Sequence, residues 1–346
     1  MTQNTIIKKG LIVVIVLLFV GTTFNQCTAN SSVENQSQPA SNGNTLYVGG
    51  NGPGNYSRIQ DAIDNASDGD TIFVYDDSSP YYEKDISIEK SINLIGENHN
   101  TVIREIDEPG NSVNVRADFV SINCFSIIGP HVYVSGDNAV ISNIYFISNP
   151  IAISLIGTKN SIISNNSFKN CRTGLELAEC SNNLISQNEI TGCEDGFIFY
   201  VPASHNTIIN NEITKNVNGI HFKGFYSYYR RYDRIENTNI QYNNITNNSI
   251  GINILGKFRN GVIENNNFVG NKESIHFNIF PGQRLKINAN FWGETKLLPQ
   301  IIPGCIIIYL YTDYSNQKNP YDIFLYLPHI VFDWNPARRP YNIGEG

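Results

Sequence analysis

Residues 162–177 read IISNNSFKNCRTGLEL and residues 184–199 read LISQNEITGCEDGFIF, so one arrangement of residue types returns after 22 positions. In each copy an isoleucine is followed three positions later by asparagine, then two later by a large apolar residue and six later by glycine. The pattern occurs five times, with steps of 22, 23, 32 and 23 residues between copies and serine in place of the last glycine. Constant internal spacing with a length change at one joint indicates one structural unit stacked on itself.

Four columns of equivalent residues define the repeat: Ile163, Ile185, Ile208, Ile240 and Ile263; Asn166, Asn188, Asn211, Asn243 and Asn266; Phe168, Ile190, Ile213, Ile245 and Phe268; Gly174, Gly196, Gly219, Gly251 and Ser274. Apolar and polar residues alternate around these columns, which is the pattern of short β-strands. Glycine and asparagine interrupt the strands and best supply the positive φ of a tight corner. Such a unit is one turn of a parallel β-solenoid, in which equivalent side chains stack about 4.8 Å apart.

The asparagine column predicts a ladder of side-chain amides, in which each amide donates to the carbonyl oxygen of the amide one turn away. Such a ladder would satisfy polar groups whose burial without a partner costs about 1–3 kcal/mol each. We therefore interpret this column as architecture. Looser copies upstream bring the prediction to on the order of nine turns, or a rod of about 45 Å.

Both ends of the rod are predicted to be covered, because open ends would expose unpaired backbone and apolar core. At the N-terminal end, Ile59, Ala62, Ile63 and Ala66 share one face of a short helix. The predicted fold is all-β: a single-stranded parallel β-helix over residues 45–290, with a short N-terminal capping helix and a C-terminal cap over 291–346.

Residues 1–29 read as a secretory signal, because Lys8 and Lys9 precede an unbroken apolar run that is short for a membrane span. Cleavage is the favoured outcome, with an uncleaved anchor or a lipid on Cys27 as alternatives. Residues 30–44 are rich in Ser, Asn and Gln and read as a flexible linker. The sequence thus predicts an exported protein that is extracellular or on the cell surface.

Composition limits the classes of partner. The net charge is −7 and charged residues are only 16%, which argues against nucleic-acid binding.

Cys171 and Cys193 fall in one column of the repeat, where stacked side chains do not converge as a disulfide requires. We expect both to be free buried thiols.

Two further stretches carry a family resemblance. Residues 57–63 (SRIQDAI) with 68–72 (DGDTI) resemble the opening segment of right-handed parallel β-helix proteins of the pectin-lyase-like superfamily. The asparagine-rich turns resemble NosD-type (periplasmic copper-binding) and carbohydrate-binding/sugar-hydrolase repeat domains common in archaeal surface proteins. Residues 288–293 (NANFWG) and 332–336 (FDWNP) resemble their closing elements. The resemblance implies a right-handed coil, but the superfamily mixes enzymes, adhesins and inert scaffolds, so it does not decide activity.

Glu189 and Glu212 lie one turn apart and are predicted to point outward, because they alternate with inward Ile190 and Ile213. Two such carboxylates could bind calcium or form the catalytic pair of a glycosidase, which needs about 5–9.5 Å between carboxyls. The alternative is a solvated face on which Lys215 relieves the repulsion.

A second outward column contains Glu176, Ile198, His221, Asn253 and His276. The two histidines are two turns apart, about 9–10 Å, which makes a shared metal ion awkward. We interpret His221, Asn253 and His276 as contacts for a sugar chain lying along this face, with ordinary exposed polar residues as the alternative.

The 32-residue step contains an insertion over residues 223–239 with Tyr226, Tyr229, Arg230 and Arg231. Tyrosine rings stack on sugar faces, and arginine binds uronate or sulfate groups bidentately. This loop is therefore a candidate ligand-binding segment; the alternative is a loop folded back on an apolar face.

Copper binding is disfavoured, because the only methionine is Met1 and only Cys171 with Cys193 could supply paired sulfur. No metal site or cofactor is expected apart from the calcium option at Glu189 and Glu212. The favoured function is structural or polysaccharide-binding, by a monomer acting without catalysis. The alternatives are a polysaccharide lyase or glycoside hydrolase on the outer face, and a NosD-type copper-site accessory protein.

Overall fold

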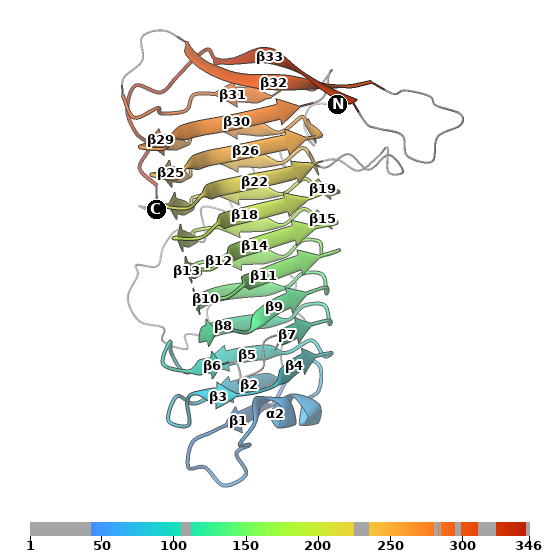
Figure 1. Cartoon of the computed structure of the whole chain (residues 1–346). Helices are drawn as coiled ribbons and strands as arrows, with labels where there is room; N and C mark the ends of the chain where they lie inside the picture. Colours follow the sequence, from blue (N-terminus) through green and yellow to red (C-terminus); the bar gives the residue numbers. More distant parts are fainter. Residues whose placement is uncertain are drawn as a thin grey trace, which may run out of the picture.

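The computed structural model of the chain describes residues 43–104, 112–224, 235–279, 283, 285–294, 299–310 and 323–343. It confirms the predicted class, a parallel β-helix whose turns stack in sequence order (Figure 1). The predicted signal peptide and nearly all of the predicted linker lie outside the described residues. Within the described part of the chain, no helix has the length and apolar composition of a membrane span.

Three sheets and one short helix build the described part of the coil. The first sheet holds β1 (Thr45–Val48), β2 (Thr71–Val74), β3 (Tyr81–Tyr82), β5 (Asn93–Gly96), β6 (Val102–Arg104), β8 (Ser121–Ile128), β10 (Val140–Ile147), β12 (Ile162–Ser164), β13 (Ser167–Lys169), β16 (Leu184–Ser186), β17 (Glu189–Thr191), β20 (Thr207–Ile209), β21 (Glu212–Thr214), β24 (Asn239–Gln241), β25 (Asn244–Thr246), β28 (Val262–Glu264), β29 (Asn267–Val269) and β31 (Lys286–Asn288). The second sheet holds β4 (Asp85–Ile88), β7 (Ser112–Val115), β9 (His131–Val134), β11 (Ile151–Ile156), β14 (Thr173–Ala178), β18 (Asp195–Tyr200), β22 (Asn218–Gly224), β26 (Ile250–Gly256), β30 (Glu273–Ile279), β32 (Gln300–Leu310) and β33 (Ile323–Asp333). The third holds β15 (Cys180–Ser181), β19 (Ala203–Ser204), β23 (Ile235–Glu236) and β27 (Phe258–Arg259), and the helix is α2 (Ile59–Asn65).

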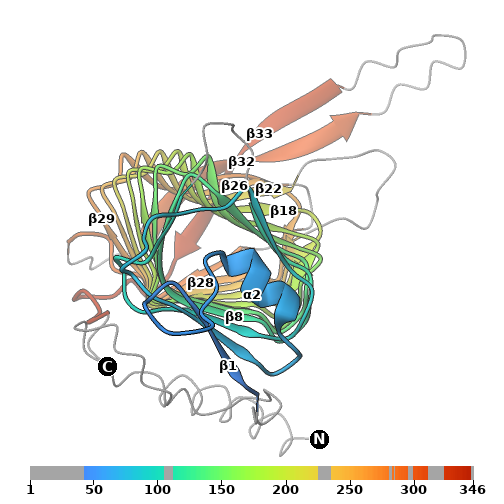
Figure 2. The same cartoon turned by 90° about the horizontal axis from the view of Figure 1, so that it is seen from below.

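The register between turns places equivalent residues side by side. Ile163 pairs with Ile185, Ile185 with Ile208, and so on through the isoleucine column to Ile287. All of these isoleucines are buried, and the core of the coil is a stack of such columns. Figure 2 looks along the coil axis and shows α2 lying over one opening.

The glycine column has a different cause from the predicted one. Its members do not have positive φ; instead, a Cβ on Gly219 would lie 2.5 Å from the carbonyl oxygen of Gly251 in the next turn, and a Cβ on Gly196 would lie 2.5 Å from that of Gly219. Glycine is needed there for close approach of backbones. The positive-φ corner falls one residue before the asparagine ladder and is taken by Asn165, Gln187, Asn210, Tyr242 and Asn265.

The asparagine ladder is present. Each side-chain amide donates to the Oδ1 of the next asparagine at 2.9–3.1 Å, and the backbone N–H of each also donates to that same oxygen at 2.9–3.0 Å. The ladder continues one turn beyond the predicted set, to Asn290. It ends on the buried carboxylate of Asp333, which accepts from the backbone N–H groups of Ala289 and Asn290 and from the indole of Trp292.

Each end of the described coil carries a distinct element. At the N-terminal end, the buried faces of Ile59, Ala62 and Ile63 in α2 pack on the first turns. The side chain of Glu83, from a neighbouring turn, accepts a hydrogen bond from the Ile59 N–H and so caps this helix. At the other end, β32 pairs parallel with β30 and antiparallel with β33, and this pair lies across the top of the coil (Figure 1).

Candidate functional site

The outward column on the second sheet is aligned as the sequence predicts. Ile198 pairs with His221, His221 with Asn253, and Asn253 with His276, on the successive strands β18, β22, β26 and β30. Although these residues point away from the apolar core, His221 is only 6% exposed and Asn253 only 8%. The two polar residues in the middle of this column, His221 and Asn253, are thus largely buried from solvent.

Asp195 joins His221 to form a buried pair. Asp195 is 6% exposed, and its Oδ1 lies 2.8 Å from the Nδ1 of His221. The ammonium of Lys223 lies 3.7 Å from the other carboxylate oxygen and 5.8 Å from the centre of the Tyr200 ring. Burial opposes ionisation of Asp195, but the hydrogen bond and charge of His221, the amide of Asn218 and the charge of Lys223 together lower its pKa below the ordinary value.

A second chain of hydrogen bonds starts from the same carboxylate. Asn218 donates its Nδ2 to Asp195 Oδ1 at 2.8 Å, and Asn253 donates its Nδ2 to Asn218 Oδ1 at 3.1 Å. Two buried atoms at the ends of these contacts have no hydrogen-bond partner: His221 Nε2 and Asn253 Oδ1. A buried polar atom without a partner costs about 1–3 kcal/mol and marks a place where a ligand, ion or water can bind. We refer to Asp195, Asn218, His221, Lys223 and Asn253 together as the outer-face cluster.

Of the other predicted ligand contacts, His276 is separate from the cluster. Its Nδ1 lies 3.0 Å from Glu273 Oε1 and its Nε2 lies 3.1 Å from Asn278 Nδ2, so both ring nitrogens already have partners. Tyr226, Tyr229, Arg230 and Arg231 lie outside the described residues, and their role stays a prediction.

Sequence reasoning missed Asp195 and Asn218. Asp195 supplies the carboxylate of the cluster, and Asn218 links it to Asn253 by hydrogen bonds. Each directly precedes a glycine of the repeat, a position that reads as a corner residue. The signal that could have found them is their place three residues before the outward column, combined with the presence of His221 and Asn253 in that column on the next turns.

Glu189 and Glu212 form a separate site on the first sheet, where they pair directly in the register. Glu189 lies 4.0 Å from Lys169, whereas Glu212 accepts a hydrogen bond from the Asn244 amide at 2.8 Å. The cation found beside this pair is therefore Lys169, and no ion pair with the predicted Lys215 is found among the described residues. Burial raises the pKa of Glu212, the Asn244 hydrogen bond opposes this, and the charge of Glu189 adds to it.

Copper binding stays a question of the two sulfurs of Cys171 and Cys193, since no larger group of metal-binding side chains is found among the described residues. No group of three or more His, Cys, Asp or Glu side chains among these residues could hold a metal. Cys171 and Cys193 are free and buried in the column that also contains Asn216, as the sequence predicts. The interaction between the two thiols lowers the pKa of Cys171 and raises that of Cys193, so one member of the pair resists the ionisation that two copper-binding thiolates require.

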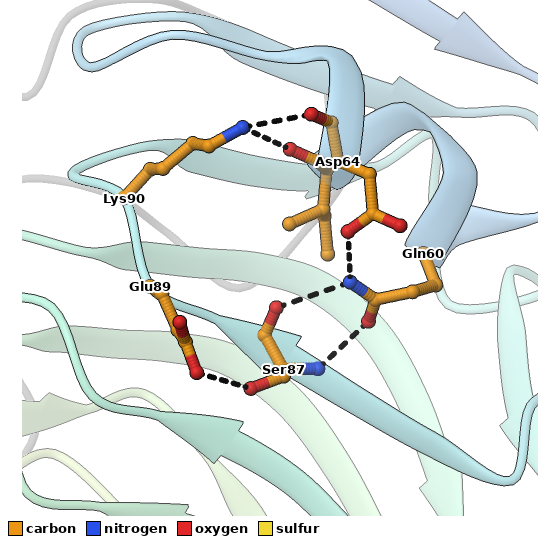
Figure 3. A pocket seen from close by; sticks show the side chains of 6 residues that line it. Gln60, Asp64, Ser87, Glu89 and Lys90 are labelled. Carbon is orange, nitrogen blue, oxygen red and sulfur yellow. Dashed lines mark hydrogen bonds between the residues drawn. The ribbon is translucent and has the colours of Figure 1, made fainter.

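A cavity of about 280 Å³ lies beside α2, and the residues that line it attach this helix to the neighbouring turn of the coil (Figure 3). Gln60 exchanges two hydrogen bonds with the backbone of Ser87 and so continues the sheet edge. The ammonium of Lys90 binds the carbonyl oxygens of Ile63, Asp64 and Ala66 at 2.7–3.1 Å, which caps the end of the helix. Most of the polar groups that line the cavity therefore form hydrogen bonds with one another or with the nearby backbone.

Comparison with known proteins assigns the family. The chain matches the family described as periplasmic copper-binding protein (NosD) over residues 63–304, and it therefore belongs to this family. No curated protein matches it.

Solved structures share the fold at low identity. The polygalacturonase of Erwinia carotovora ssp. carotovora is similar with a TM-score of 0.54 and 9% identity, over 75% of this chain and 94% of that one. The enzymatically active domain of tailspike protein 2 of bacteriophage CBA120 is similar with a TM-score of 0.51 and 12% identity, over 70% of this chain. The match spans only 41% of the tailspike chain. These likenesses describe the fold alone.

Proposed function

We propose that this protein is an exported β-helix that binds a polysaccharide along the outer face of its second sheet, at the outer-face cluster. The observation that carries the proposal is the pair of buried, unpartnered acceptor atoms on adjacent turns, His221 Nε2 and Asn253 Oδ1. Buried polar groups are normally paired, so this pair is suited to a ligand that brings its own donors.

Several features support a saccharide as the ligand. The outward column runs along the stacked strands, so an extended polymer can lie across successive turns. Hydroxyl groups are abundant donors on every sugar ring. The polygalacturonase, whose name states an action on a polysaccharide, has the same fold.

Export is supported by the apolar segment after Lys8 and Lys9 and by the periplasmic description of the family. The copper role that the family description names is not proposed for this chain, because no group of three or more His, Cys, Asp or Glu side chains supports it in the described ranges.

The test is a panel of neutral and acidic polysaccharides in affinity electrophoresis or calorimetry with the full-length protein. Retention by at least one polymer, weakened in Asn253→Leu, is the expected result. Absence of retention across the whole panel would refute the proposal. The triple alanine variant at Tyr226, Tyr229 and Arg230 tests whether the loop contributes to binding. Unchanged binding in this variant would contradict the predicted contribution.

A second candidate is glycoside hydrolysis at Glu189 and Glu212. Adjacent turns are about 4.8 Å apart, close to the carboxyl separation of about 5–5.5 Å in retaining glycosidases. The raised pKa of Glu212, beside a Glu189 that lies near Lys169, is the division of roles that an acid and a nucleophile need. Release of reducing ends that is abolished in Glu212→Gln would support it, and a calcium titration of the same variant tests the metal alternative.

A further inference from the structure

The hydrogen bonds within the outer-face cluster limit the class of ligand that it can bind. We propose that the cluster accepts hydrogen bonds from hydroxyl groups of a neutral saccharide and discriminates against anionic sugars. This inference rests on the proposed function and names the class of sugar that the same site takes.

The first step concerns the imidazole. A neutral histidine has one N–H and one lone pair, and a carboxylate can only accept. Because Asp195 Oδ1 lies 2.8 Å from His221 Nδ1, the proton of the neutral ring is on Nδ1. The lone pair is then on Nε2, the buried atom without a partner.

The second step concerns the orientation of two amides. Asn218 faces the carboxylate of Asp195 and must present its NH₂ group there, so its oxygen faces Asn253. Asn253 in turn must direct its NH₂ group at that oxygen, which leaves its own Oδ1 as the unpartnered atom. A single anion thereby fixes both open positions as acceptors.

The third step concerns spacing and charge. His221 and Asn253 are directly paired on adjacent strands, so their side chains stack at about 4.8 Å, within reach of two donors from one sugar. An ionised uronate or sulfate brings acceptors and a negative charge to two lone pairs beside Asp195. Lys223 already faces that carboxylate at 3.7 Å. Hydroxyl donors are therefore favoured over anionic groups.

Comparison with another histidine shows why the pair matters. His131 on β9 also has a buried, unpartnered Nε2. No carboxylate contact is found for its ring among the described residues, and no second unpartnered acceptor is paired with it. His131 therefore provides a matched control for loss of a lone buried ring nitrogen.

The experiment measures binding of the neutral and the acidic polysaccharides of the same panel to the full-length protein at about pH 8. The variants are His221→Phe, Asn253→Leu and the control His131→Phe, each checked for the wild-type β-sheet circular dichroism spectrum. Loss of one acceptor is expected to weaken neutral-polysaccharide binding about tenfold in either site variant, while the control stays within about twofold.

The outcomes separate the two proposals. Binding of the acidic polymer alone would overturn the present inference and leave saccharide binding standing. No binding of any polymer in the panel would overturn both proposals, and would assign the two acceptors to an ordered water. Equal weakening in His131→Phe would also overturn the inference, because the effect would not be local to the cluster. If His221→Phe fails to fold, Asn253→Leu decides on the same criteria.

Discussion

Truncation of one asparagine in the middle of the ladder should destabilise the coil strongly. Asn211 Oδ1 accepts from both the backbone N–H and the side-chain amide of Asn188, at 2.9 and 3.0 Å. Its own amide donates to Ile185 O and to Asn243 Oδ1. Asn211→Ala strands one buried backbone donor, at about 1–3 kcal/mol, and removes side-chain bonds that contribute about 1 kcal/mol each. The expected loss is about 3–5 kcal/mol, a large share of an ordinary domain's stability of about 5–15 kcal/mol.

The assay combines urea unfolding with native-state hydrogen exchange, because a stacked coil can open locally without unfolding throughout. The variant should lower the unfolding midpoint and speed exchange of the Asn188 amide. Asn51→Ala, at an exposed asparagine, is the control and should change neither. A free-energy change below about 0.5 kcal/mol in Asn211→Ala, with unchanged protection of Asn188, would refute the ladder as a source of stability.

Three other perturbations test the packing and the charges. Gly219→Ala places a Cβ 2.5 Å from the carbonyl oxygen of Gly251 and should cost about 1–3 kcal/mol in a denaturant titration; a neutral result would contradict close approach as the reason for glycine. Since the folded-state pKa of Asp195 is lowered, its contribution to stability is present above the ordinary aspartate pKa of about 3.9 and is lost as pH falls through the folded value. Asp195→Asn should remove this part of the acid dependence of the thermal midpoint, and an unchanged pH profile would contradict the assigned contacts. Because the folded pKa of Glu212 is raised, the protonated carboxyl stabilises the folded state at low pH, and this contribution is lost as pH rises through the folded pKa. Glu212→Gln is uncharged and can still accept the hydrogen bond from Asn244, so it should not lower the thermal midpoint at neutral pH.

The fold could be predicted because its main determinants repeat. Isoleucine, asparagine and glycine recur at constant spacing, and a parallel stack brings equal positions together whatever the length of the joint between turns. The reason for the glycine column could not be read in the same way, because close approach and positive φ both favour glycine. Only the position of the next turn's carbonyl distinguishes the two.

The candidate site was predictable in part. His221 and Asn253 follow from the outward column. Asp195 and Asn218 pair with each other in the register, three positions before that column, and their contacts with His221 and Asn253 run from one column to the other. The same limit applies to Asp333, which ends the ladder from 43 residues beyond Asn290. Contacts that occur once, between different columns, leave no periodic signal in the sequence.

The ring nitrogens of His221 provide the most direct readout of the outer-face cluster. Nitrogen-15 NMR of the histidine side chains should show a proton on Nδ1 of His221, the nitrogen that faces Asp195, and a lone pair on Nε2. Addition of a neutral polysaccharide should then shift the Nε2 resonance to lower frequency, as that lone pair accepts a hydroxyl hydrogen. A proton on Nε2, or an Nε2 resonance that does not move when the polysaccharide is bound, would contradict a saccharide site built on this acceptor.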